Sequence, residues 1–328
     1  MTLPKIIVCP GTLAKDNNTY SSTALKHVFY GKKVSAILNY DSPASNESTD
    51  ALFTENRKQM SISGVQEKFS VLLEKNKLRL IQEGEQGQYI LKPIPNVGKN
   101  ASQMPANEHV TMQIARQVFN IETAENALIF FKNGDPAYIT KRFDIKEDGS
   151  KWAQEDFAAL AERTPQTHGE DFKYLGNYLE IFTILKKYTP AYAIESVKLF
   201  KLIFFNYLFS NGDAHFKNFS LIETPLGDFK LSPAYDLLNS RMHIDDKDFA
   251  LEEGLLPLNL AKGKITVQFY ILGELAGISK KQIDKVFKDL TANKEEVLVL
   301  IGASFLNEKA KLNYTKGYLT RLKKLLRS

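Results

Sequence analysis

The segment from Ser210 to Asn218 contains the side chains best suited to catalysis. Asp213 and Asn218 lie five positions apart, which is the Asp-x-x-x-x-Asn spacing of a kinase catalytic loop. A carboxylate at the first position can orient an acceptor hydroxyl and take its proton, and a carboxamide at the second can bind a metal ion that bridges phosphates. The spacing therefore predicts a phosphoryl-transfer loop with Asp213 as the catalytic base.

A second acid, Asp236, follows this loop after a predicted short β-hairpin at residues 219–231. Mg²⁺ prefers carboxylate and phosphate oxygens, with water completing its octahedron. Asn218 and Asp236, carried by two adjacent loops, would provide such a metal site. The order of helix, Asp-x-x-x-x-Asn loop, hairpin and acid is more specific than any one of these parts.

The N-terminal half would then hold the nucleotide. The segment from Met60 to Lys68 is rich in small residues, so its backbone N–H groups could approach phosphate oxygens. Lys92 ends a predicted strand, and Glu108 follows at the start of a predicted helix. A strand lysine paired with a helix glutamate is a kinase arrangement. The end of the last predicted hairpin, Lys141 to Phe143, is where a hinge that contacts adenine would lie.

These residues require a β-rich first half and a helical second half. Alternating apolar residues predict strands at 69–73, 78–80, 88–92, 127–131 and 137–143, and a helix is predicted over 107–119. After about residue 155 the pattern is helical, with a long apolar helix at 192–210 and a basic amphipathic helix at 318–326. The sequence predicts an α+β, two-lobed protein-kinase-like fold with a β-rich N-lobe over residues 1–145 and a helical C-lobe over residues 146–328. The polar stretch at positions 1–60 is expected to be irregular.

Composition excludes several other classes of protein. The 328 residues include 43 basic and 38 acidic side chains, a net charge of +5 that does not argue for direct nucleic-acid binding. A single cysteine, Cys9, cannot form an internal disulfide and favours a reducing compartment. No apolar run approaches the roughly 18 residues that span a bilayer, so we expect a cytoplasmic protein without membrane contact.

Six segments together resemble the HipA-type serine/threonine kinase toxins, and most closely their short HipT form. The segments are Ser61-Ile62-Ser63-Gly64-x-Gln66-x-Lys68, Ile90-Leu91-Lys92-Pro93, Asn107-Glu108, Arg142-Phe143-Asp144, Asn211-Gly212-Asp213-x-His215-x-Lys217-Asn218-Phe219 and Pro233-x-Tyr235-Asp236. They span residues 60–240. Glu67 departs from the HipT-like loop and matches the longer HipA form. The resemblance to the family is therefore stronger than the resemblance to the HipT subgroup.

The resemblance implies a role for each matching residue. Asp213 would be the catalytic base, and Asn218 and Asp236 would hold Mg²⁺. The residues that contact ATP would be Ser63, Gly64, Val65, Gln66, Lys68, Lys92, Lys141, Phe143, His215, Lys217, Asn218, Tyr235 and Asp236. Autophosphorylation would fall on Ser61 and Ser63. A phosphoserine adds a charge of about −1.5 to −2 where ATP phosphates should bind, so we expect this modification to inhibit the kinase.

The resemblance also implies substrates and partners. The protein target would be an aminoacyl-tRNA synthetase, whose phosphorylation halts translation. The partners would be a HipB-like DNA-binding antitoxin and, for the short form, a small HipS-like protein. The segment that precedes the phosphate loop is too short for the extra N-terminal subdomain of longer HipA-type chains, and we expect a separate polypeptide to supply that part.

Two alternatives stay open at the level of sequence. Small-molecule kinases of the aminoglycoside or choline type share a similar Gly-Asp-x-His loop, so the segment from Asp213 to Asn218 does not discriminate against them. The other alternative is a non-catalytic nucleotide-binding or antitoxin-docking module. The intact set of Lys92, Asp213, Asn218 and Asp236 argues against it.

Overall fold

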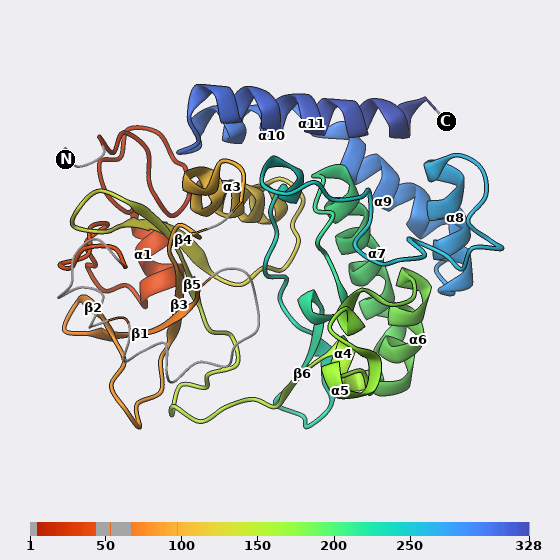
Figure 1. Cartoon of the computed structure of the whole chain (residues 1–328), viewed down its shortest axis with the longest axis horizontal. Coiled ribbons are helices and arrows are strands. Elements are labelled where there is room, and N and C mark those ends of the chain that lie inside the picture. The colour runs from red at the N-terminus through yellow and green to blue at the C-terminus, as the bar shows by residue number, and fades with distance from the viewer. Residues whose placement is uncertain (1–4, 44–52, 54–66, 97, 328) are drawn as a thin grey trace.

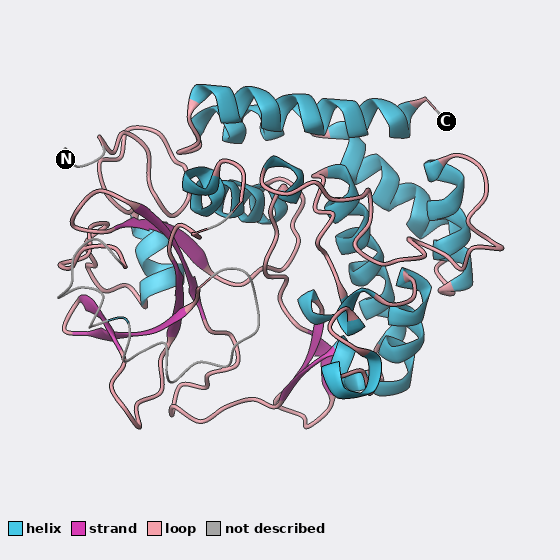
Figure 2. Ribbon diagram, viewed as in Figure 1, coloured by secondary structure: helices cyan, strands magenta, loops and turns pink. Residues whose placement is uncertain are grey.

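The computed structural model describes residues 5–43, 53, 67–96 and 98–327, and every structural statement below concerns these residues. A five-stranded sheet and one short helix form one side of the molecule, and a group of helices with a small second sheet forms the other (Figure 1). Two helices link the sides: α3 lies between them, and α11 runs along the top (Figures 1 and 2). The architecture is the expected mixture of a β-rich part followed by a helical part.

The large sheet is antiparallel, with strand order β2-β1-β3-β5-β4. Its strands are β1 (Phe69–Glu74), β2 (Lys77–Leu80), β3 (Tyr89–Lys92), β4 (Asn126–Phe130) and β5 (Pro136–Lys141). The β1–β2 turn needs two residues with positive φ, and Lys75 and Asn76 adopt 45° and 66°. Gly134, with φ of 93°, turns the chain between β4 and β5. The predicted strands are therefore confirmed to within a few residues.

The expected irregularity of positions 1–60 is wrong for one segment. Helix α1 (Ser22–Phe29) packs on the sheet, where Ala24, Val28 and Phe29 are buried. Ser21 caps it, because its hydroxyl accepts a hydrogen bond from the Ala24 N–H at 3.2 Å. With only two turns, the helix is too short for its apolar spacing to stand out in the sequence.

Helix α3 (Met104–Gln117) begins earlier than the predicted residue 107, after the short 3₁₀ helix η1 (Ala101–Gln103). Pro105 fits its first turn, where a missing N–H costs nothing. Every residue from Pro105 to Ala115 is buried, because β4 and β5 cover one face and α10 covers another. The first turns of the helix are therefore held firmly in the core.

The second half contains eight α-helices and a three-stranded sheet of order β6-β7-β8 among the described residues. The helices are α4 (Phe157–Leu160), α5 (Pro165–His168), α6 (Tyr178–Tyr188), α7 (Tyr192–Leu208), α8 (Ile265–Leu275), α9 (Lys280–Ala292), α10 (Lys294–Ala303) and α11 (Glu308–Leu326). The strands are β6 (Gln154–Asp156), β7 (Ser220–Glu223) and β8 (Phe229–Leu231). The predicted hairpin is β7–β8, and β6 is an addition that the sequence did not indicate. Three short 3₁₀ helices complete this half: η2 (Phe172–Tyr174), η3 (Phe216–Asn218) and η4 (Ser240–Met242).

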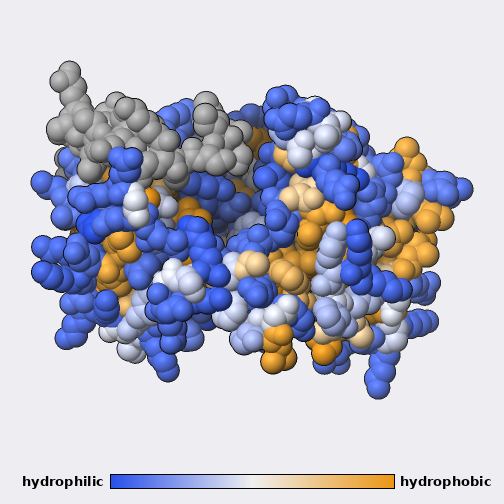
Figure 3. Space-filling model, turned by 90° about the horizontal axis from the view of Figure 1, so that it is seen from below, coloured by the Kyte–Doolittle hydropathy of each residue, from blue (hydrophilic) through white to orange (hydrophobic). Residues whose placement is uncertain are grey.

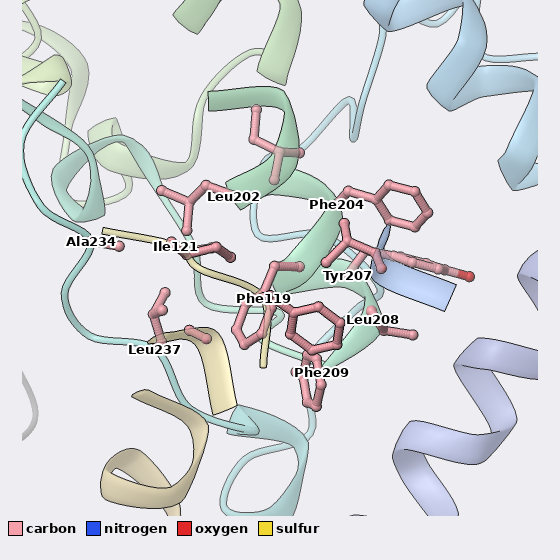
Figure 4. Close-up of a cluster of buried hydrophobic side chains, with 14 of the residues drawn as sticks. Phe119, Ile121, Leu202, Phe204, Tyr207, Leu208, Phe209, Ala234 and Leu237 are labelled. Atoms are coloured by element: carbon pink, nitrogen blue, oxygen red, sulfur yellow. The ribbon is translucent and has the colours of Figure 1, made fainter. Parts of the chain in front are cut away.

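Helix α7 is the centre of this half, as its apolar composition predicts. Figure 4 shows its C-terminal turns packed against Phe119 and Ile121, together with Ala234 and Leu237. Each large apolar side chain of this kind contributes about 1.5–3 kcal/mol on full burial. Because Ala234 and Leu237 flank Asp236, the loop that carries this acid is anchored in the core.

Helix α11 begins at Glu308 rather than at the predicted residue 318, after an Asn307 cap whose side chain accepts from the Ala310 N–H at 2.9 Å. No helix in the described residues is long and apolar enough to cross a membrane. On the face seen in Figure 3, apolar residues gather over the helical half rather than over the sheet. The division of the chain at residue 145 stays a prediction.

Candidate functional site

A buried lysine lies at the centre of the site. Lys92, the last residue of β3, is 4% exposed, and its Nζ is 2.6 Å from Oε1 of Glu108 on α3. The same Nζ contacts Oδ1 of Asp236. Sheet, helix and loop thus each contribute one charged side chain to a single cluster.

Electrostatic pairing determines the charges of Lys92 and Asp236. Burial raises the pKa of Glu108, and the Lys92 ammonium opposes this. Burial would also raise the pKa of Asp236, but Lys68 and Lys92 outweigh it and hold that pKa well below its usual range. For Lys92, the two carboxylates outweigh the effect of burial and raise the pKa. Lys92 is therefore a cation and Asp236 an anion at neutral pH.

The backbone at Asp236 is in an unusual conformation. Its φ is +55°, in the left-handed region that residues other than glycine seldom adopt. The Asn211 Nδ2 donates to the Asp236 carbonyl oxygen at 3.3 Å, and the buried neighbours described above hold the chain on both sides. Such conformations cluster at functional sites, where the surrounding structure determines them.

The predicted catalytic loop follows α7, where Ser210 has φ of 56° and ends the helix. Oδ1 of Asp213 accepts a hydrogen bond from the Tyr174 hydroxyl at 2.8 Å. Burial raises the pKa of Asp213, while the Tyr174 bond and the Lys173 charge oppose the rise. Asp213 is thus a carboxylate with increased proton affinity, the property that a general base requires.

His215 orders the loop through its backbone. Its N–H donates to Oδ1 of Asn218 at 3.0 Å, and the Asn218 N–H donates to the His215 carbonyl at 2.9 Å. Burial lowers the pKa of the imidazole to about 3, so the ring is neutral. The ring packs edge-on against Tyr174 at 5.1 Å, and its Nδ1 has no hydrogen-bond partner within the described chain.

The two predicted metal ligands lie side by side. Nδ2 of Asn218 donates to Oδ2 of Asp236 at 3.3 Å. One carboxylate and one carboxamide from adjacent loops fit the oxygen ligands of Mg²⁺, which keeps its other positions for phosphate and water. Lys68 also approaches this place, with its Nζ 3.5 Å from Asp236 Oδ2. The donor set therefore fits a divalent cation.

Five residues of the predicted phosphate loop are not among those that the structure describes. Ser61, Ser63, Gly64, Val65 and Gln66 lie outside the described residues. Their predicted roles stay predictions.

Two aromatic rings stand beside the cluster. The rings of Phe143 and Tyr235 have centroids 5.9 Å apart, and the Tyr235 hydroxyl donates to the Lys217 carbonyl at 3.0 Å. The Lys217 ammonium itself pairs with Asp156 at 2.9 Å, between β6 and α4. The backbone of Lys217 is thus close to the rings, while its charge is engaged elsewhere.

Lys141 is the predicted residue that the structure separates from the others. Its Nζ lies over the ring of Tyr30, 3.6 Å from the centroid, and its N–H donates to the Glu125 carbonyl at 2.7 Å. A cavity of about 360 Å³ beside Lys141 and Phe143 is not lined by Lys92 or Asp236. The Lys141 side chain is therefore directed to Tyr30 rather than to the cluster.

Sequence reasoning missed Tyr174 and Asn211 as supporting residues. Tyr174 lies in a 3₁₀ turn far from any motif, and no spacing rule connects it to Asp213. Asn211 belongs to one of the six segments quoted above, but no role was predicted for its side chain. An asparagine in a tight turn was the signal that could have indicated one.

A β-rich part with a lysine–glutamate pair, followed by a helical part with an Asp–Asn loop, defines a protein with a kinase-like fold. Residues 60–298, more than two thirds of the chain, match the model of the HipA-like C-terminal domain. The chain therefore belongs to the HipA-like family. The HipT subgroup stays a prediction.

Similar proteins agree with this assignment. A Haemophilus influenzae protein named "Putative kinase" is 26% identical over 328 aligned residues, covering 93% of this chain and 92% of that protein. "Putative kinase Y4dM" of Sinorhizobium fredii is 32% identical over 225 residues, covering 64% of this chain and 52% of that protein. In the structure of the HipA, HipB and operator DNA complex of Shewanella oneidensis MR-1, a chain matches with a TM-score of 0.62 and 18% identity. That match covers 82% of this chain and 65% of the other, and it shows the fold.

Proposed function

We propose that this protein is an ATP-dependent serine/threonine protein kinase that acts as the toxin of a toxin–antitoxin system. The observation that carries the proposal is a set of contacts among charged and polar side chains. Lys92 pairs with Glu108 and Asp236, and Asp236 is bonded to Asn218. Asn218 belongs to the same loop as Asp213. The family match and the kinase names of the relatives support it.

In this proposal Asp213 is the catalytic base. The substrate hydroxyl oxygen attacks the γ-phosphorus of ATP, and its proton passes to the Asp213 carboxylate. The bond from the γ-phosphorus to the β,γ-bridging oxygen breaks, and ADP leaves with that electron pair. Tyr174 occupies one lone pair of Asp213 Oδ1, and an ionised carboxylate has further acceptor positions for the substrate.

Positive charge near the phosphates would come from this chain and from magnesium. Lys92 would contact the α- and β-phosphates while Glu108 holds its ammonium in place. Asn218 and Asp236 would hold Mg²⁺, which neutralises phosphate charge when bound. Lys68 would exchange its contact with Asp236 for one with the phosphates.

The rest of the nucleotide would lie toward Phe143 and Tyr235. Their rings would provide an apolar platform for adenine next to the backbone of Lys217. His215, whose ring is neutral, would also contact the nucleotide. The segment from Ser63 to Gln66 would supply backbone N–H groups to the phosphates, and Lys141 would contribute through its backbone.

We further propose that the kinase modifies Ser61 and Ser63 and that this inhibits it. A phosphoserine in the phosphate loop would be repelled by the Asp236 carboxylate and would compete with ATP for Lys68 and Lys92. The segment that carries both serines directly precedes Lys68 in sequence.

The proposed protein target is an aminoacyl-tRNA synthetase. The partners would be a HipB-like antitoxin and, if the chain is of the HipT form, a small HipS-like protein. Cytoplasmic location follows from such a target. The Shewanella structure, in which HipA was crystallised with HipB and operator DNA, supports an antitoxin partner.

Radiolabel transfer from ATP tests this function. Wild-type protein, Asp213→Asn and the control Asp284→Asn are incubated with cell extract, with purified synthetases and with small-molecule acceptors. We expect label on a synthetase with the wild type and the control, and labelling at least about 10²-fold slower with Asp213→Asn. Label on small molecules alone would favour an aminoglycoside-type kinase, and ATP binding without any transfer would favour a non-catalytic module.

A further inference from the structure

The segment of residues 239–246, here called the bridging segment, begins three residues after Asp236 and contacts two parts of the site. At one end it is bonded to α3 through Asn107, the residue that directly precedes Glu108. Nδ2 of Asn107 donates to the Asn239 carbonyl at 2.9 Å, and Oδ1 of Asn107 accepts from the Asn239 N–H at 3.0 Å. Both polar ends of one side chain therefore hold the segment.

His243 adds a second connection on the same side. Its Nε2 is 2.7 Å from Nδ2 of Asn107, and its Nδ1 is 2.9 Å from the Lys99 carbonyl. Because Asn107 donates and the carbonyl accepts, the ring is neutral with its proton on Nδ1. The Lys99 N–H returns a bond to the His243 carbonyl at 2.9 Å. The start of α3 and the bridging segment are thus joined from both sides.

At its other end the segment holds the catalytic loop. Oγ of Ser240 accepts from the Gly212 N–H at 2.8 Å, one residue before Asp213. The same hydroxyl is 3.2 Å from the Ser210 carbonyl and contacts the Asp246 carboxylate. The Ser240 hydroxyl therefore accepts a hydrogen bond from the catalytic loop at Gly212 and has one proton to donate, either to Ser210 in that loop or to Asp246.

Packing at Gly212 shows how closely the two parts fit. A Cβ atom added at residue 212 would lie 2.4 Å from the Lys247 carbonyl oxygen and 2.6 Å from Cγ of Asp246. The end of the bridging segment therefore touches the backbone of the catalytic loop directly, and only glycine leaves room for this approach.

The polar side chains of this connection are almost fully buried. Asn107 is 0% exposed, His243 is 2% and Ser240 is 3%. Buried polar groups lose their water, so each depends on the partner that the segment provides. Removing one partner leaves another group unpaired and disturbs the connection as a whole.

We propose that the bridging segment sets the position of α3 relative to the catalytic loop, with Asn107 and Ser240 as positioning residues for phosphoryl transfer. Glu108, which orients Lys92, and Asp213 lie on separate elements and must act on one ATP molecule. The segment joins the residue before Glu108 to the residue before Asp213. The kinetic part of this inference rests on the proposed kinase function.

Kinetics of Asn107→Ala, Ser240→Ala and the double variant test the positioning role. The matched controls are Asn126→Ala, a buried asparagine of β4, and Ser304→Ala, a buried serine at the end of α10. We expect each test variant to lower kcat about tenfold with KM for ATP changed less than about twofold. Because both residues act through one segment, the double variant should lose about as much as the more damaging single variant.

An unchanged kcat in a folded Ser240→Ala protein would overturn the positioning role. Fold-reductions of kcat that multiply in the double variant would also overturn it. Equal losses of kcat in the two control variants would do the same. If Asn107→Ala does not fold, Ser240→Ala and Ser240→Thr carry the test, and the threonine variant should regain activity because it keeps the hydroxyl.

Amide hydrogen exchange tests the connection without any enzymatic activity. In Asn107→Ala, the peptide covering residues 206–218 should exchange faster, although no hydrogen bond within the described residues joins it to the Asn107 side chain. In Ser240→Ala, the peptide covering the start of α3 should exchange faster. Changes confined to the mutated element would overturn the proposed connection. If the wild type transferred no phosphate, the proposed kinase function would be refuted. The exchange experiment would still test whether the bridging segment connects α3 to the catalytic loop.

Discussion

The two acidic loops of the site hold their carboxylates in opposite ways. Asp236 is surrounded by cations, because Lys92 and Lys68 both contact it. Asp213 is held by the neutral hydroxyl of Tyr174 in a partly buried position. The pKa of the first is lowered and that of the second is raised. Paired groups whose environments move their pKa values apart take different chemical roles.

This difference explains which residue suits which task. A carboxylate that stays ionised at all ordinary pH values is suited to binding a cation. A carboxylate with increased proton affinity is suited to taking a proton from a hydroxyl. The comparison therefore supports the proposal that Asp236 binds the metal and Asp213 takes the proton, the roles that the spacing of the sequence motif predicts.

Removing the proposed base should have the largest effect. Asp213→Asn keeps an oxygen for Tyr174 but cannot take a proton, so we expect kcat to fall about 10²–10⁴-fold. KM for ATP should change little, since Asp213 is not a nucleotide ligand in this account. Steady-state kinetics on the labelled substrate measure both, and a kcat within about threefold of the wild type, at equal folding, would contradict the assignment.

Removing the central lysine should cost the most stability. Lys92→Met leaves Glu108 buried without its partner, and breaking a buried pair in this way costs about 3–5 kcal/mol. The control Lys311→Met breaks an exposed pair with Glu308 and should cost less than about 1 kcal/mol. Urea unfolding compares the two, and equal losses would show that the cluster is not held by this pairing.

The two acids should affect stability with opposite sign. The pKa of Asp236 is lowered in the fold, so its charge stabilises the protein above about pH 4, the ordinary value of an aspartate, and this is lost as pH falls through the folded pKa. The pKa of Asp213 is raised, so its charge opposes folding at neutral pH. Asp236→Asn should therefore lower the free energy of unfolding at pH 7, and Asp213→Asn should raise it. Unfolding in urea at pH 7 measures both, and shifts of the same sign would break the comparison.

The smallest expected effect concerns Tyr174. Tyr174→Phe removes a hydrogen bond that lowers the pKa of Asp213, so the acid limb of the pH–rate profile should move to higher pH. Loss of one such bond amounts to roughly 1 kcal/mol, so the limb should move by about 0.7 pH unit. Tyr270→Phe, which removes a similar bond to the exposed Asp284, serves as the control. An unmoved acid limb would show that Tyr174 does not influence the base.

Much of the fold and site followed from local patterns in the sequence. The strands that end at Lys92 and near Lys141, the helix that carries Glu108 and the loop from Asp213 to Asn218 all depend on spacing within a few residues. Such features are set by the periods of helix and strand, so the sequence alone indicates them.

The parts that could not be predicted depend on distant contacts. Helix α1 is stabilised by burying its apolar side chains against the sheet, and β6 is a strand because it pairs with β7. Tyr174 reaches Asp213 across 39 positions of the sequence, and Asn107 reaches Asn239 across 132. No local spacing encodes these pairs, because the fold of the whole chain brings them together.

Magnesium dependence of ATP binding tests the central comparison most directly. Calorimetric titration of ATP, with and without Mg²⁺, is carried out on the wild type, Asp236→Asn and Asp213→Asn. The account predicts that Mg²⁺ strengthens ATP binding to the wild type and to Asp213→Asn, and that Asp236→Asn loses this dependence. Magnesium-dependent binding that survives in Asp236→Asn but disappears in Asp213→Asn would contradict it.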